Sequence, residues 1–249
     1  MMKKIILRMD DVGASTKKYE VYSKYRIGNI LFLKYLKPFK AWGPYKELTE
    51  DEWEQIFLIL SKYNAKITIG VTATWVDEKN QLIPFHKKFP NQALKLKEGI
   101  KNNLIEVANH GLTHCVVGKH LPRLFTSNRK FHREFWDYLD QDLHNNHIQD
   151  SQKIFEDWLG EKPISFIPPG NVYSTKTVNS IKNTDILIIN STKKINTQYG
   201  KIKYVNEENV IPFHDREISL YGVKWLEDMI VDILRKYNQV NFINLKDLL

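Results

Sequence analysis

Cysteine is nearly absent from this sequence, in which Cys115 is the single cysteine among 249 residues. One cysteine excludes a disulfide framework and any metal site built from several thiolates. We interpret Cys115 as a small buried residue. Its neighbour His114 leaves a second interpretation open, in which the thiol is an extra metal ligand or a reactive group.

Long apolar runs are also missing. No stretch approaches the about 18 consecutive apolar residues of a membrane-spanning helix. Near the N-terminus only Ile5, Ile6 and Leu7 separate Lys4 from Arg8, whereas a signal peptide needs about 7–15 apolar residues. We therefore expect a cytoplasmic protein with no transmembrane segment, for which peripheral contact with the inner membrane face stays open.

Acidic residues are outnumbered by basic ones. The chain has 37 Lys and Arg against 29 Asp and Glu, a formal net charge of +8. This surplus favours acidic partners, such as anionic glycans, nucleotides or phosphorylated lipid carriers, without choosing among them. No nucleic-acid-binding motif accompanies the charge, so we expect no nucleic-acid partner. A hydrophobic content of 42% excludes a disordered chain.

Short apolar runs of strand length alternate with helical patterns along the chain. This alternation predicts a parallel α/β fold, and a length near 250 residues fits one barrel of strands and helices. No repeat, linker or composition break divides the sequence, so we expect one domain over residues 1–249. The predicted strands are 4–9, 66–72, 104–108, 163–167, 185–190, 201–205, 209–213 and 239–243, and the predicted helical regions are 49–60, 85–102, 129–160 and 219–237.

Polar motifs follow four of the predicted strands. Adjacent carboxylates such as Asp10 and Asp11 raise each other's pKa unless a cation lies nearby, and histidines four residues apart, such as His110 and His114, can bind one metal. A proline-proline-glycine turn at 168–170 and His214 follow two later strands. Each motif alone also fits an ordinary surface turn or a surface histidine. Together they point to one site, because the carboxyl ends of parallel barrel strands lie on one rim.

With these motifs in this order, the chain resembles the polysaccharide deacetylase superfamily, the NodB-homology or carbohydrate esterase family 4 proteins, over residues 5 to about 215. The resemblance implies a distorted (β/α)7 TIM-like barrel. It also implies metal-dependent removal of an N-acyl group, usually acetyl, from an amino sugar. Segments 10–15 and 19–23 further resemble a subgroup found in bacterial O-antigen and capsule loci.

The resemblance also implies roles for individual residues. The cofactor is expected to be a divalent metal, with Zn2+ best suited to the ligands and Co2+, Ni2+, Fe2+ or Mn2+ as alternatives. The substrate would be an N-acylated amino sugar, linked to a nucleotide or to a lipid. The assigned residues are Asp10 as catalytic base, His214 as catalytic acid, Asp11, His110 and His114 as metal ligands, and Pro168, Pro169, Gly170 and Arg216 as substrate-binding residues.

Three positions depart from the family pattern. Gly111 stands where the family usually has Ser or Thr, and Ile167 stands where an arginine usually holds the base. Asn190 is the nearest residue to the place of an acid that tunes the late histidine. We consider Arg8 or Arg216 as a replacement for the missing arginine.

These departures leave alternatives open. Asp215 is a candidate partner for His214. The protein could also be a deformylase or another amide hydrolase of the same fold, or a non-catalytic glycan-binding relative. Segment 19–46, rich in aromatic residues and lysine, is either an insertion packed on the barrel or a rim that contacts sugars, phosphates or membrane.

Overall fold

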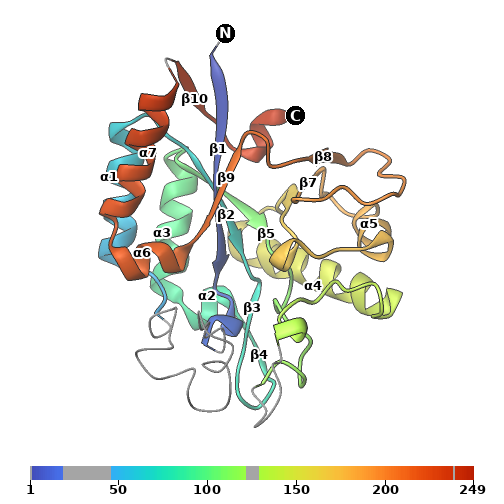
Figure 1. Cartoon of the computed structure of the whole chain (residues 1–249). Coiled ribbons are helices and arrows are strands. Elements are labelled where there is room, and N and C mark those ends of the chain that lie inside the picture. Colours follow the sequence, from blue (N-terminus) through green and yellow to red (C-terminus); the bar gives the residue numbers. More distant parts are fainter. Residues whose placement is uncertain (1, 19–45, 122–128, 238) are drawn as a thin grey trace, which may run out of the picture.

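A curled parallel sheet forms the centre of the protein (Figure 1). The computed structural model describes residues 2–18, 46–121, 129–237 and 239–249. The sheet has eight strands, and its neighbouring strands are parallel. Seven of them lie in the order β10 (Val240–Phe242), β1 (Lys3–Val12), β2 (Ile67–Val71), β5 (Ile105–Asn109), β6 (Ser165–Phe166), β7 (Ile188–Asn190) and β8 (Lys203–Val205), and β9 (Val210–His214) also pairs with β1.

The sheet curls into a half-barrel, which confirms the predicted barrel-like α/β fold. Within the described residues no ladder pairs β8 with β9, so the barrel has an open seam between these two strands. A cavity of about 330 Å³ lies in this seam, lined by residues of β1, β8 and β9, including Ile6, Tyr204 and Val210. The seam matters for the site because the side chain of Arg8 on β1 contacts Glu207, in the connection between β8 and β9.

Helices cover the half-barrel on two sides (Figure 1). On the left of the view lie α1 (Glu50–Lys62), α3 (Pro90–Lys101), α6 (Asp215–Tyr221) and α7 (Lys224–Lys236), and on the right lie α4 (Gln141–Leu159) and α5 (Thr175–Ile181). The side chain of Trp53 on α1 is fully buried in the main apolar core, together with Leu7 and Met9 of β1. None of the helices in the described part of the chain combines the length and apolar character that a membrane crossing requires.

Two predicted helices are each divided in two. The predicted helix 85–102 becomes α2 (Phe85–Lys88) and α3, because Pro90 disfavours helical geometry at Phe89, whose φ is −129° and ψ 65°. The predicted helix 219–237 becomes α6 and α7, with Gly222 at φ 79° between them. By contrast, α1 begins as predicted, after a capping box formed by Thr49 and Glu52.

The largest difference concerns residues 129–160. The spacing of Phe131, Phe135 and Leu139 predicted a helix through this region, but α4 begins only at Gln141, after a short 3-10 turn η4 (Arg129–Phe131). Phe135 instead packs edge-on against the ring of Phe166, with the ring centroids 5.4 Å apart. Contacts distant in sequence therefore override the local helical pattern.

Some elements were not predicted. An antiparallel hairpin of β3 (Thr74–Val76) and β4 (Leu82–Pro84) follows β2, and α5 follows the proline turn, whose 3-10 helix is η5 (Pro169–Asn171). Two further 3-10 helices, η1 (Ser15–Lys18) and η6 (Leu245–Leu248), follow β1 and β10. Most of the segment 19–46, for which two interpretations were left open above, lies outside the described residues.

Candidate metal centre

The carboxyl end of β1 departs from regular strand geometry. Its register against β2 shifts between Met9 and Val12, and Asp11 has a φ of 71°. In a regular strand, neighbouring side chains point to opposite faces, and a bulge re-aims them. Both Asp10 and Asp11 are consequently buried at the carboxyl end of the sheet, with 6% and 5% of their surfaces exposed.

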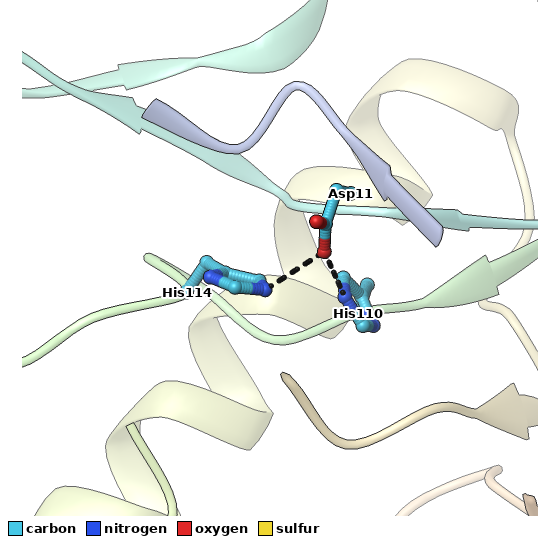
Figure 2. Close-up of side chains that lie close together, drawn as sticks. All are labelled: Asp11, His110 and His114. Carbon is cyan, nitrogen blue, oxygen red and sulfur yellow. Dashed lines mark hydrogen bonds and ion pairs between the residues drawn. The ribbon is translucent and has the colours of Figure 1, made fainter. Parts of the chain in front are cut away.

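The loop after β5 brings two histidines to Asp11 (Figure 2). Nε2 of His110 lies 3.2 Å, and Nε2 of His114 lies 3.0 Å, from Oδ1 of Asp11. One ligand atom from each residue lies within 4.8 Å of the other two. His114 reaches this position with a φ of 58°, so both it and Asp11 have left-handed backbone conformations, which are costly and cluster at functional sites.

The hydrogen bonding of His110 indicates which of its ring nitrogens carries the proton. Its Nδ1 lies 2.7 Å from the backbone oxygen of Ile167. A carbonyl oxygen only accepts hydrogen bonds, so Nδ1 carries the proton, and in the neutral ring Nε2 presents a lone pair. This lone pair faces the carboxylate of Asp11. Such an arrangement requires a shared cation, either a second proton on the ring or a metal.

Positive charge around Asp11 meets part of this need. Burial raises the pKa of Asp11, but the electrostatic effect of His114 and His214 outweighs burial and holds this pKa well below its usual range. A guanidinium nitrogen of Arg216 lies 3.7 Å from Oδ2 of Asp11. Asp11 is therefore ionised and can only accept hydrogen bonds. Together with the two imidazoles it forms a set of candidate ligands that fits Zn2+ or a similar divalent cation.

Contacts to their Nδ1 atoms orient the rings of the two histidines. The carbonyl of Ile167 holds His110, and the hydroxyl of Thr16 lies 2.9 Å from Nδ1 of His114. Contacts of this kind fix ring orientation and ligand basicity in metal sites. The sequence motifs did not reveal Thr16, since a threonine in a short turn carries no signal of its own.

A buried glutamate explains Gly111. Glu134 accepts hydrogen bonds from the backbone N–H and the hydroxyl of Thr113, at 3.0 and 2.7 Å, and its Oε2 lies 2.7 Å from Nδ1 of His147. A Cβ atom on Gly111 would lie 1.6 Å from Oε1 of Glu134. The carboxylate thus occupies the space that a larger residue needs, and Glu134 was not identified from the sequence.

His214 completes the rim from β9, next to Asp10 in the ladder between β1 and β9. Its Nε2 lies 3.9 Å from Oδ2 of Asp11, and its Nδ1 lies 3.6 Å from Oε1 of Glu217. Burial lowers the pKa of His214, but Asp11 and Glu217 outweigh it and raise the pKa to about 9. The acid beside this ring is therefore Glu217. Asp215, considered as its partner, pairs with Lys17 instead.

The remaining assigned residues surround this centre. Pro168 and Pro169 are buried, and a Cβ on Gly111 would lie 3.1 Å from Cγ of Pro169. The proline loop thus packs directly on the loop that carries His110 and His114. Gly170 has a φ of 58° and packs against the side chain of Arg133.

Cys115 is fully buried, and burial raises its pKa well above the usual value. The structure therefore confirms it as a small buried residue. The thiol stays protonated at neutral pH, which makes it neither a ready nucleophile nor a ready ligand.

The geometry defines a half-barrel protein with a candidate Asp-His-His metal centre on its carboxyl-end rim. The family described as polysaccharide deacetylase matches residues 43–189, more than half of the chain, and the chain belongs to this family. The matched region contains His110, His114 and the proline loop, while Asp10, Asp11 and His214 lie outside it. A search of curated proteins finds no match.

Solved structures share the fold. A family 4 acetyl xylan esterase from Clostridium thermocellum, in complex with a cobalt ion, is 16% identical with a TM-score of 0.54, covering 99% of this chain and 90% of that one. A family 4 carbohydrate esterase from Bacillus anthracis is 14% identical with a TM-score of 0.53, covering 99% and 82%. A family 4 pseudoenzyme from Bacillus anthracis is 14% identical with a TM-score of 0.53, covering 99% and 65%.

Proposed function

We propose that this protein is a metal-dependent deacetylase that removes the N-acetyl group from an amino sugar during synthesis of a bacterial surface polysaccharide. One observation carries the proposal: the lone pair of His110 Nε2 and the nearby His114 Nε2 both face the ionised carboxylate of Asp11. Membership in the polysaccharide deacetylase family supports the reaction class. The O-antigen or capsule context rests on the resemblance of segments 10–15 and 19–23.

Asp11, His110 and His114 are the residues that would hold the metal. A divalent cation supplies Lewis-acid polarisation of the amide oxygen and lowers the pKa of water. Three protein ligands leave further positions open, as catalytic metal sites require. Zn2+ is our first choice, and Co2+, Ni2+, Fe2+ and Mn2+ suit the same ligands.

Asp10 and His214 would move the protons. Oδ1 of Asp10 is buried and makes no hydrogen bond within the described residues, so it can accept a proton from the attacking water. His214 is on the neighbouring strand, with its side chain 37% exposed, and its raised pKa keeps a proton available for the leaving amine. The two residues therefore serve as base and acid in one reaction.

The 168–170 loop and Arg216 would contact the substrate. Neither proline has an N–H group, and the N–H of Asn171 donates to the carbonyl of Pro168. Gly170 is then the residue of this turn whose N–H we assign to the oxyanion that forms during hydrolysis. Arg216, together with the net charge of +8, favours a substrate carried on a nucleotide or a phosphorylated lipid, in the cytoplasm or at the inner membrane face.

The test measures acid release and metal content together. The purified protein, treated with chelator and reloaded with Zn2+, is incubated with N-acetylated nucleotide sugars and lipid-linked sugars. We expect acetate release, one bound metal per chain, and loss of turnover in Asp10→Asn with metal content unchanged. Acetate release that persists in Asp10→Asn would remove Asp10 as the base.

A second hydrolase function uses the same test. The altered surroundings of the base, with Ile167 in place of an arginine, favour a different acyl group as the alternative. Release of formate alone, from N-formylated sugars, would make the protein a deformylase. Absence of both acids across the substrates, with sugar binding retained, would make it a non-catalytic glycan-binding relative.

A further inference from the structure

Arg8 is a charged side chain buried in the interior of the sheet. Only 1% of its surface is exposed. A buried guanidinium is costly unless acceptors surround it. Arg8 donates to two, Oδ2 of Asp10 at 2.9 Å and Oδ1 of Asn190 at 2.6 Å, and it also forms an ion pair with Oε1 of Glu207 at 2.9 Å.

These three partners of Arg8 come from both sides of the open seam. Asp10 lies on β1, Asn190 ends β7, and Glu207 lies in the connection between β8 and β9. The amide of Asn190 in turn donates to the carbonyl of Val205 on β8, at 3.0 Å. Arg8 therefore links β1 to the end of β7 and to the connection between β8 and β9 by side-chain contacts, on the side of the half-barrel where no ladder of the described strands joins β8 to β9.

The same contacts divide the carboxylate of Asp10 into two unlike oxygens. Oδ2 is held by Arg8, whereas Oδ1 is buried and makes no hydrogen bond within the described chain. Oδ1 and the ring of His110 both lie next to Gly70, where an added Cβ would be 3.4 Å from Oδ1 and 3.3 Å from Nδ1 of His110. Fixing Oδ2 thus also fixes the position of Oδ1.

We propose that Arg8 is a positioning residue for Asp10 and that Asn190 and Glu207 hold Arg8 in place across the seam. The orientation of the base then depends on closure of the seam by side chains, through residues that touch neither metal nor substrate. The inference rests on the proposed function, because it takes Asp10 to be the base. It assigns to Asn190 a role toward Arg8 in place of the one considered toward His214.

The experiment compares Arg8→Lys, Asn190→Ala and Glu207→Ala with Glu208→Ala as the matched control, because Glu208 is an exposed neighbour in the same connection. Displacing a reacting group by about 1 Å can cost about 100-fold in rate. We expect kcat to fall about 100-fold in Arg8→Lys and about tenfold in the other two seam variants. KM and the metal content of one per chain stay unchanged, and Glu208→Ala matches the wild type.

A second set of variants separates positioning from general stability. In an Asp10→Asn background, Arg8→Lys and Glu207→Ala should reduce kcat no further, since their target is already lost. An equal loss in both backgrounds, or full kcat in all three seam variants, overturns the inference. If Arg8→Lys does not fold, the partly exposed Glu207 carries the same comparison.

The two proposals fail in different ways. A wild-type protein that releases no acid from any substrate overturns the proposed function and this inference with it. A wild-type protein that turns over, while the seam variants keep its kcat, overturns this inference alone.

Discussion

Two buried carboxylates lie near opposite ends of the same sheet, and they are satisfied in opposite ways. Glu106, near the amino end of β5, accepts hydrogen bonds from the hydroxyls of Ser165 and Thr68 at 2.5 and 3.0 Å. It also accepts one from the backbone N–H of Lys246 at 3.1 Å. The protein itself thus supplies the donors around this carboxyl group.

Asp11, at the carboxyl end, faces nitrogen atoms of two imidazoles, one of which is tied down through its other nitrogen. Burial raises the pKa of Glu106 despite its donors, whereas the pKa of Asp11 is lowered because positive groups surround it. The contrast shows how a structural carboxyl group differs from one arranged for a ligand. The first is complete within the protein, and we propose that a bound cation completes the second.

Substitution of Asp11, the proposed carboxylate ligand of the metal, should give the largest effect and the sharpest contrast with Glu106. Mutation of a residue that hydrogen-bonds to a metal ligand typically lowers metal affinity about 10–100-fold. Loss of the ligand itself in Asp11→Asn should therefore lower metal affinity by more than about 100-fold. Glu106→Gln should keep wild-type affinity. Zn2+ titration against a chelating dye measures both. Equal affinities in the two variants would show that the Asp11 cluster is not the metal site.

Substitution of Gly111 tests a third buried carboxylate, Glu134, which accepts hydrogen bonds from Thr113 in the loop that carries His110 and His114. Gly111→Ser would introduce a Cβ 1.6 Å from Oε1 of Glu134 at a φ of 84°. Overpacking costs about 1–3 kcal/mol and left-handed geometry about 1–2 kcal/mol, so we expect a loss of about 3 kcal/mol in urea unfolding. Gly111→Ser with Glu134→Ala should lose less than the sum of the two single variants. Strict additivity would contradict the steric explanation.

The sequence predicted the parts of this site that lie at strand ends. Parallel strands align their carboxyl ends, so the motifs could be placed on one rim from their order, and the family resemblance then implied that Asp11, His110 and His114 form one set of ligands. The residues that support them were not predictable. Thr16 and Glu134 reach the histidine loop across distant parts of the chain, and neither belongs to a motif.

The fold shows the same division. The short apolar runs in the sequence located the strands of the sheet, because a strand that is buried in the core is apolar in its own local composition. The open seam was not foreseen, since it depends on which strands fail to pair. The helix expected through 132–140 was also wrong, because the contact of Phe135 with Phe166 is set by packing and not by spacing.

Truncation of Glu106 should reduce stability while sparing the metal site. Glu106→Ala leaves the donors of Thr68, Ser165 and Lys246 without their acceptor. An unsatisfied buried polar group costs about 1–3 kcal/mol, so we expect a loss of about 2 kcal/mol in urea unfolding. Metal affinity should stay at the wild-type value. A fall in metal affinity would show that the two ends of the sheet are coupled.

The smallest effect is a change in pH dependence. Because burial raises the pKa of Glu106 in the folded state above its unfolded value of 4.5, its contribution to stability is complete below pH 4.5 and is lost as the pH rises through the folded pKa. The stability of the wild type relative to Glu106→Gln should therefore decline over this range, by at most about 1.4 kcal/mol per pH unit. Urea unfolding of both proteins between pH 4 and 8 measures it. A relative stability that rises with pH would mean that the fold holds Glu106 ionised, and the contrast with Asp11 would then lie in the partners of the two carboxylates and not in their charge.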